Sequence, residues 1–201
     1  METTKKIDWE KHWPNLLALY PFLAEDGGNY TRVLLLDEEA MVDTRKTKTV
    51  LTHLARNFSL DLTLVKARGR KVLHCSREVP LVIMSELVLL PVKRREPPMK
   101  DAGSMGYVVL SQIAGWDDSP EAGFRTRILF HNQNYLDILT SQTTFRKRIA
   151  EAEQLLGDYH RRHQLYQGTP GFPVGYGWPP NGHSWAMVRE KNRSGGFRGF
   201  Y

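Results

Sequence analysis

Basic side chains that could bind a polyanion are concentrated between Thr44 and Glu78. This segment has nine basic and two acidic residues, an excess of seven positive charges, whereas the whole 201-residue chain has a net charge of +6. Positive charge focused on one folded face raises the local concentration of polyanions, of which nucleic acid is the commonest. A solvated surface that only keeps the protein soluble would carry similar charges. The basic residues are Arg45, Lys46, Lys48, Arg56, Lys66, Arg68, Arg70, Lys71 and Arg77.

Residues for catalysis or metal binding are sparse. His160 and His163 have helical ligand spacing, but the sequence offers no matching pair of ligands to complete a site. His131 beside Asn132 could belong to a nuclease or small hydrolase, although no cluster of acids accompanies it. The chain has no glycine-rich phosphate loop, and its single cysteine, Cys75, cannot form an internal disulfide. We therefore expect no enzyme, no cofactor and no metal, with hydrolysis through His131 as the weakest alternative.

The elements that must position the basic residues follow from the hydrophobic pattern. Turn signals separate the first two expected strands and the last two, so the sequence predicts two β-hairpins. Sequential strands joined by turns predict an α+β fold with a largely antiparallel β-sheet or partial barrel. The expected strands are 16–23, 30–36, 40–42, 60–64, 79–84, 87–92, 106–113, 125–130 and 135–138, with a loop at 115–123.

One short internal helix is expected within the basic segment. Val50, Leu51 and Leu54 recur at helical spacing and predict a helix at Thr47–Asn57. Its other face carries Lys48 and Arg56, which would suit contacts to phosphates.

The remaining basic residues are expected on a loop at 66–71. Lys66, Arg68, Arg70 and Lys71 surround Gly69, which is free to adopt a positive φ and bring the backbone close to a ligand. Arginines on such a loop could enter a narrow minor groove, where A-tract DNA concentrates negative potential.

A long C-terminal helix is the clearest element. Apolar residues from Phe145 to Tyr166 recur at steps of three and four, and Thr140 or Ser141 can cap the helix. Gly157 costs roughly 1 kcal/mol in a helix interior and could end the helix early.

The chain is expected to form one domain with two tails. We predict a flexible N-terminus at 1–13, a single DNA-binding domain at 14–166 and a disordered tail at 167–201, rich in Gly, Pro and aromatic residues. The basic and aromatic residues of that tail could stack on bases, so an RNA or single-strand binding module is the main alternative function.

No segment is expected to enter a membrane. The longest apolar stretch, 79–92, contains Glu86 and two prolines and is too short to span a bilayer. The apolar run at 16–23 contains Pro21 and lacks a cleavage site, so it does not predict a signal peptide. We expect a soluble, cytoplasmic protein associated with the nucleoid.

A series of short motifs runs along residues 16–165. In chain order they are Ala18-Leu19-Tyr20-Pro21, Arg56-Asn57-Phe58-Ser59, Arg68-Gly69-Arg70-Lys71, Val79-Pro80-Leu81-Val82-Ile83, Leu87-Val88-Leu89-Leu90-Pro91-Val92, Gly106-Tyr107-Val108, Phe130-His131-Asn132, Leu139-Thr140-Ser141 and Phe145. The order of these motifs resembles the competence transcription factor (ComK) family of Gram-positive bacteria. One departure is the segment 59–62, which replaces a Gly-Ser-rich segment of the family; a second is that the C-terminal motif for adaptor and protease control is not found at 172–178.

This resemblance implies a DNA-binding transcription activator of genes for DNA uptake. It implies recognition of AT-rich promoter boxes through the minor groove, binding as a homo-oligomer (dimer or tetramer) to double-stranded DNA, and RNA polymerase as a further partner. The expected DNA-binding residues are Arg56, Arg68, Gly69, Arg70 and Lys71, with Lys66 and Lys48 in support.

Overall fold

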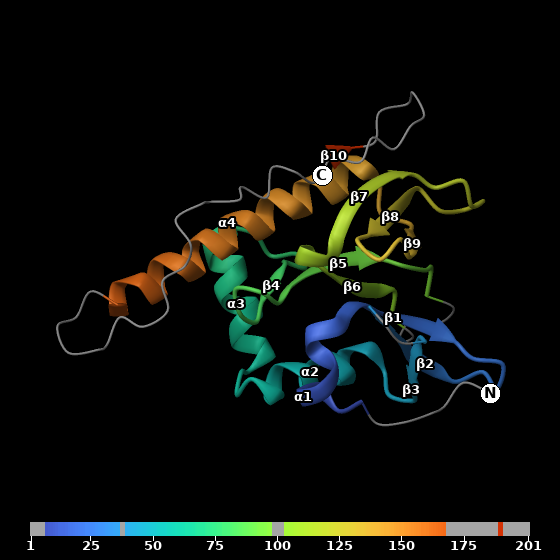
Figure 1. The fold of residues 1–201 in the computed structure, drawn as a ribbon, viewed down its shortest axis with the longest axis horizontal. Coiled ribbons are helices and arrows are strands. Elements are labelled where there is room, and N and C mark those ends of the chain that lie inside the picture. The colour runs from blue at the N-terminus through green and yellow to red at the C-terminus, as the bar shows by residue number, and fades with distance from the viewer. Residues whose placement is uncertain (1–6, 37–38, 98–102, 168–188, 191–201) are drawn as a thin grey trace.

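The computed structural model describes residues 7–36, 39–97, 103–167 and 189–190. It confirms the α+β class, with mixed helices and mainly antiparallel strands and a long helix near the end of the described chain (Figure 1). Within these residues the strands form two open sheets, and neither closes into a barrel.

The larger sheet has six strands, and every neighbouring pair is antiparallel. Its first hairpin, predicted from a Gly-Gly-Asn turn, is confirmed. In spatial order the strands are β3 (Met41–Asp43), β2 (Asn29–Leu35), β1 (Leu16–Leu23), β6 (Met105–Val109), β5 (Val88–Lys93) and β4 (Leu81–Val82).

The smaller sheet contains the second predicted hairpin, β8 (Thr126–Phe130) with β9 (Tyr135–Ile138). The other neighbour of β8 is β7 (Ile113–Asp118), and β10 (Arg189–Glu190) pairs with β7 in parallel. The strand expected at 106–113 is interrupted by a 3₁₀ turn at Leu110–Gln112. The loop expected at 115–123 begins later than predicted, because β7 continues to Asp118.

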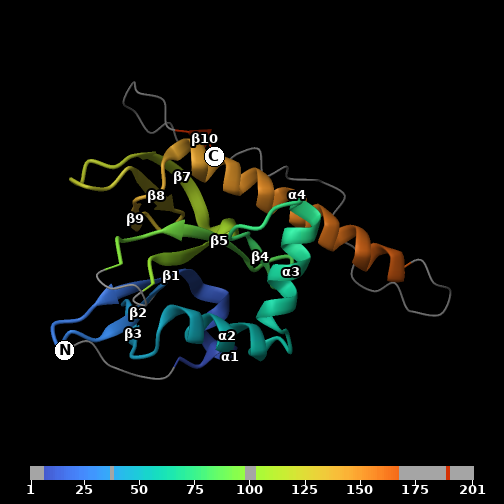
Figure 2. The same cartoon turned by 180° about the vertical axis from the view of Figure 1, so that it is seen from behind.

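Two hydrophobic cores lie on opposite faces of the six-stranded sheet. Successive strand residues point to opposite faces, so Leu89 and Val109, which are paired, belong to one core, whereas the next pair, Leu90 and Val108, belongs to the other. Helices α1 (Trp9–His12), α2 (Thr47–Asn57) and α3 (Leu62–Leu73) contribute to the first core, and α4 (Gln142–Gln167) with the small sheet to the second. Figure 1 shows α1 and α2 below β1 and β5, with α4 above them, and Figure 2 shows the same order from behind.

The C-terminal helix is confirmed, and it continues through Gly157. The Ser141 hydroxyl accepts a hydrogen bond from the Thr144 amide at 3.3 Å, as expected of a cap. A Cβ at Gly157 would lie 3.7 Å from the nearest described side-chain atom, so the helix has no packing reason to bend there.

The N-terminal segment differs from the flexible one expected at 1–13. From Ile7 onward it is packed: the helix α1 and a 3₁₀ turn at Trp13–Asn15 precede β1, and the Trp9 side chain is buried at 4% exposure. Residues 1–6 and most of the expected tail at 167–201 lie outside the described residues.

The predictions of a strand at 60–64 and a loop at 66–71 are wrong, because α3 spans both. The Asp61 carboxylate accepts hydrogen bonds from the amides of Thr63 (2.6 Å) and Leu64 (3.3 Å), which caps the helix and lowers the pKa of Asp61. Leu62 and Gly69 are buried, two helical turns apart. The alternation of leucines suggested a strand, but Leu64 faces solvent.

Candidate nucleic-acid interface

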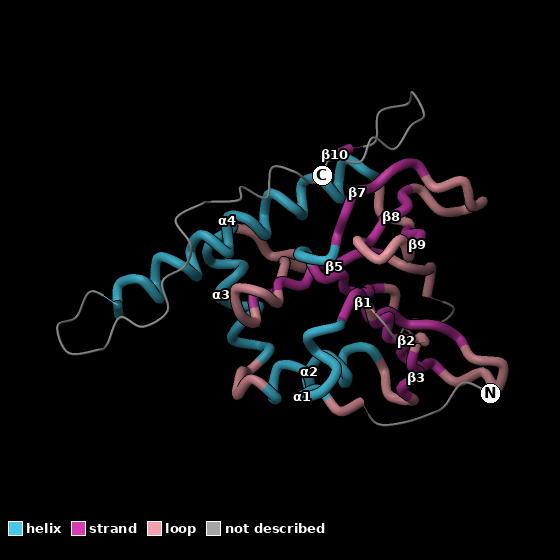
Figure 3. The backbone as a smooth tube through the Cα atoms, viewed as in Figure 1, coloured by secondary structure: helices cyan, strands magenta, loops and turns pink. Residues whose placement is uncertain are grey.

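Helices α2 and α3 form a helix-turn-helix arrangement. Only residues 58–61 separate them (Figure 3), and α3 leaves the direction of α2 steeply in Figures 1 and 2. Ser59 in this turn has φ 57°, a left-handed conformation in which such turns often have glycine. Phe58, Leu60 and Val65 pack against the core on the helical side of the six-stranded sheet, which fixes the two helices on the sheet.

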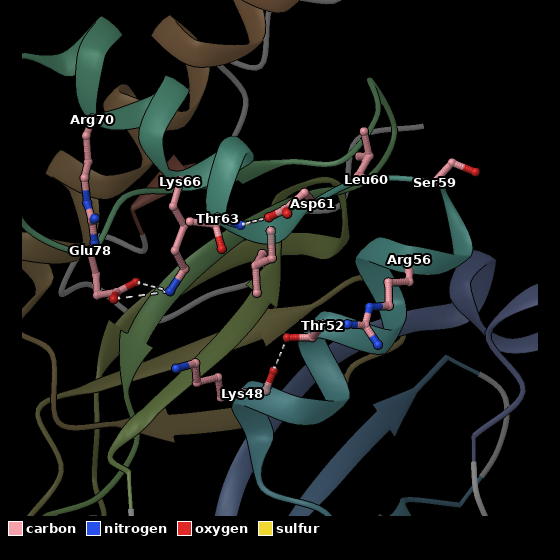
Figure 4. Close-up of a pocket in the computed structure, with 11 residues that line it drawn as sticks. Lys48, Thr52, Arg56, Ser59, Leu60, Asp61, Thr63, Lys66, Arg70 and Glu78 are labelled. Atoms are coloured by element: carbon pink, nitrogen blue, oxygen red, sulfur yellow. Dashed lines mark hydrogen bonds and ion pairs between the residues drawn. The ribbon is translucent and has the colours of Figure 1, made fainter.

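A groove of about 700 Å³ runs between these two helices. Lys48 and Arg56 of α2 and Lys66 and Arg70 of α3 line it, and we call it the α2–α3 groove. Figure 4 shows Lys48 and Lys66 extending from the two helices into the same space. The structure thus brings together four of the seven predicted site residues, although the expected loop is a helix.

Carboxylates from other elements neutralise four of the nine cations of the basic segment. Two are predicted site residues: Lys66 pairs with Glu78 at 3.0 Å and Arg68 with Asp158 at 2.8 Å. The other two pairs are Arg45 with Asp43 and Arg77 with Glu151. Three of the four acids lie outside the segment, so the positive surface is smaller than the count of its charges indicates.

Five of the nine cations have no carboxylate partner among the described residues; four of them lie on α2 and α3, and the fifth, Lys46, precedes α2. Among the described residues, no carboxylate pairs with Lys48, Arg56, Arg70 or Lys71. The Arg70 guanidinium donates from Nε to the Arg77 carbonyl at 3.2 Å, a contact that leaves its charge intact. These four side chains can therefore replace counterions around a polyanion.

Arg68 lies on the opposite side of α3 from the α2–α3 groove and binds α4. Its guanidinium donates three hydrogen bonds to the Asp158 carboxylate, and Arg162 donates a fourth. Burial raises the pKa of Asp158, but these bonds and the two positive charges outweigh burial, so the pKa lies below its ordinary value. Arg68 therefore holds two helices together in this structure, a role the sequence did not indicate.

Gly69 does not have the positive φ of a loop residue that the sequence analysis expected, and this expectation is wrong. It lies inside α3, and the glycines with positive φ in the described chain are Gly27, Gly103 and Gly123. A Cβ at Gly69 would lie 2.9 Å from Cγ2 of Val79 and 3.5 Å from Cδ1 of Leu155. The glycine allows α3 to approach α4 and the chain before β4. The loop predicted around it is wrong, because a helix takes its place in the described chain.

The outward face of α3 carries residues that the sequence analysis missed. Thr63, Leu64 and Ala67 are exposed, together with the predicted Lys71 in the last turn. The signal was present as Asp61, a good N-cap, followed by inward residues at helical spacing. It was hidden by the competing pattern of alternating leucines.

The other candidate groups are not brought into a site. Within the described ranges, no group of three His, Cys, Asp or Glu residues is placed to hold a metal ion. His163 stacks on the Tyr159 ring at a centroid distance of 3.9 Å, and His131 is exposed in the β8–β9 turn. In the expected tail, the structure describes the backbone of β10. The aromatic and basic side chains of the tail lie outside the described part of the chain.

The described helices include none that is long and apolar enough to cross a bilayer. Comparison of the chain with models of protein families, with curated proteins and with solved structures gave no match.

Proposed function

We propose that this protein binds double-stranded DNA through the helix-turn-helix formed by α2 and α3, and that it regulates transcription. The observation that carries the proposal is the gathering of unpaired cations on these two helices. Lys48 and Arg56 on α2, and Arg70 and Lys71 on α3, have no carboxylate partner among the described residues. Cations on helices that flank a turn can contact successive phosphates and set the register of a protein on a duplex.

The regulatory part of this proposal rests on the resemblance to competence transcription factors. A preference for AT-rich boxes, binding as a homo-oligomer, contact with RNA polymerase and association with the nucleoid stay predictions. Reading of the minor groove also stays a prediction, but the loop geometry from which it was argued is replaced by a helix.

Binding of a labelled 30-base-pair duplex, followed by fluorescence anisotropy, tests the proposal. The variant Arg70→Gln should weaken binding about tenfold or more, because a hydrogen bond to a charged group contributes about 1.5–3 kcal/mol. The matched control is Arg125→Gln, which removes one charge from an exposed position at the end of the small sheet. It should bind as the wild type does.

Two results would contradict the proposal. One is equal loss of affinity in Arg70→Gln and Arg125→Gln, which would indicate a general charge effect. The other is complete competition by a single strand of equal length at lower concentration, which would favour the single-strand alternative.

A further inference from the structure

Helix α3 stands as a ridge between two hollows. On one side is the α2–α3 groove, and on the other is a groove of about 570 Å³ between α3 and α4, which Leu64, Arg68 and Arg162 help to line. The exposed residues Ala67 and Lys71 line neither groove, while Thr63 borders the first and Leu64 the second, so these four residues form the crest of α3 between the two grooves. The major groove of B-DNA is about 12 Å wide and admits an α-helix of this kind.

The exposure of Leu64 on this ridge is unusual. Its side chain is 69% exposed, more than Leu23 (52%) or Tyr135 (55%), the other exposed large hydrophobic residues of the described chain. It lies in the first turn of α3 and is not part of either core. Ala67 follows one turn later with a small side chain, so the helix can approach a surface closely at this face.

Cations flank the ridge on both sides. Lys48 and Arg56 lie on the α2 side. On the α4 side, Arg68 and Arg162 share the single Asp158 carboxylate, which leaves one net positive charge. A ridge that presents an exposed leucine and an alanine between two basic flanks complements a major groove, whose floor displays thymine methyl groups and whose two walls are phosphate backbones.

We propose, on the basis of the proposed DNA binding, that α3 enters the major groove and that Leu64 reads the C5-methyl groups of thymine. Lys48 and Arg56 contact one phosphate backbone, and Arg162 contacts the other. A preference for A·T pairs then arises from methyl groups in the major groove and not from the width of the minor groove. Thymine methyl groups are displayed only on the major-groove side of a base pair, so the two modes can be separated chemically.

Three duplexes of one AT-rich sequence distinguish the modes. The first is unmodified. In the second, deoxyuridine replaces thymidine and removes the methyl groups from the major groove. In the third, inosine·cytosine pairs replace the A·T pairs, which keeps the minor-groove pattern of A·T but presents a major groove like that of G·C.

The wild-type protein should bind the deoxyuridine duplex about fourfold more weakly for each methyl group that Leu64 covers. It should also lose affinity for the inosine duplex. The variant Leu64→Ala should bind the thymidine and deoxyuridine duplexes equally. The matched control Leu23→Ala, which shortens an exposed leucine at the end of β1, should keep the wild-type difference.

Undiminished binding of both modified duplexes would overturn the major-groove assignment and favour the minor groove, while leaving DNA binding intact. If Leu64→Ala keeps the full thymidine preference, the role of Leu64 is wrong even if α3 is in the groove. Failure to bind all three duplexes would overturn the proposed function itself.

Discussion

Arg68 and Arg70 are two residues apart on one helix, and their surroundings differ. Arg68 faces α4 and donates to the Asp158 carboxylate, whereas Arg70 faces the α2–α3 groove and donates only to a backbone carbonyl. A helix rotates about 100° per residue, so side chains at i and i+2 point to nearly opposite sides. Of these two neighbouring arginines, one therefore serves the fold and the other is available to a ligand.

The Arg68–Asp158 pair should make the stability depend on pH. Because the folded pKa of Asp158 lies below its ordinary value of 3.8, its ionised form stabilises the folded state above that pH, and the contribution is lost as pH falls through the folded pKa. Asp158→Asn should lower the unfolding free energy by about 0.5–1 kcal/mol at pH 6.5, the range of partly exposed pairs.

Urea unfolding at pH 6.5 and at pH 3 measures this effect. The difference between wild type and Asp158→Asn should shrink at the lower pH. The control is Glu153→Gln, which neutralises an exposed acid on the same helix. A difference for Asp158→Asn that stays constant between the two pH values would contradict the account of the pair.

At the scale of elements, the position of α3 depends on close contact at Gly69. The glycine lets the helix reach Val79 and Leu155, and Arg68 beside it adds the link to Asp158. These contacts hold the inner side of α3 against Val79 and α4, and the opposite, exposed side of the helix faces solvent.

Two helix-interior glycines allow a matched test of this contact. Gly157→Ala should raise the unfolding free energy by about 1 kcal/mol, because alanine favours a helix and the site has space. Gly69→Ala gains the same propensity but forces the buried Val79 to move, at a cost of about 1–3 kcal/mol. Urea unfolding should therefore show that only Gly157→Ala stabilises the protein. Equal stabilisation by both would show that α3 is not held closely at Gly69.

Most elements could be predicted from the sequence, because their signals are local. The turns of the two hairpins and the apolar stripes of α2 and α4 belong to short segments, and each was found. Helix α3 was missed because Leu60, Leu62 and Leu64 alternate as in a strand, although Leu64 is exposed. The Arg-Gly-Arg motif was interpreted as a loop. The glycine is required by close contact with Val79 and Leu155, which lie 10 and 86 positions further along the chain, so the local sequence does not show this requirement.

The candidate site was predicted only in part for the same reason. Lys48 and Arg56 lie on the polar face of an amphipathic helix, and such a face is visible in the sequence. Arg68, which was predicted to contact DNA, pairs with a carboxylate 90 residues along the chain. A count of charged residues in the sequence does not show which cations have a carboxylate partner in the fold.

At the scale of the whole molecule, α4 joins the two halves. Its first turns reach the small sheet, where Phe145 packs edge-on against Trp116 at a centroid distance of 5.6 Å. Its later turns reach α3 through Leu155 and Asp158. The central sheet carries the basic helices on one face and the small sheet on the other, so the unpaired cations lie together around α2 and α3 (Figure 1).

The salt dependence of duplex binding tests the role of these cations most directly. The logarithm of affinity should fall with the logarithm of salt concentration by about 0.9 for each phosphate neutralised. The double variant Arg56→Gln/Arg70→Gln should therefore reduce this slope by about 1.8, whereas Arg125→Gln/Lys147→Gln, with the same net charge, should keep the wild-type slope. An unchanged slope in the first double variant would contradict DNA binding through the α2–α3 groove.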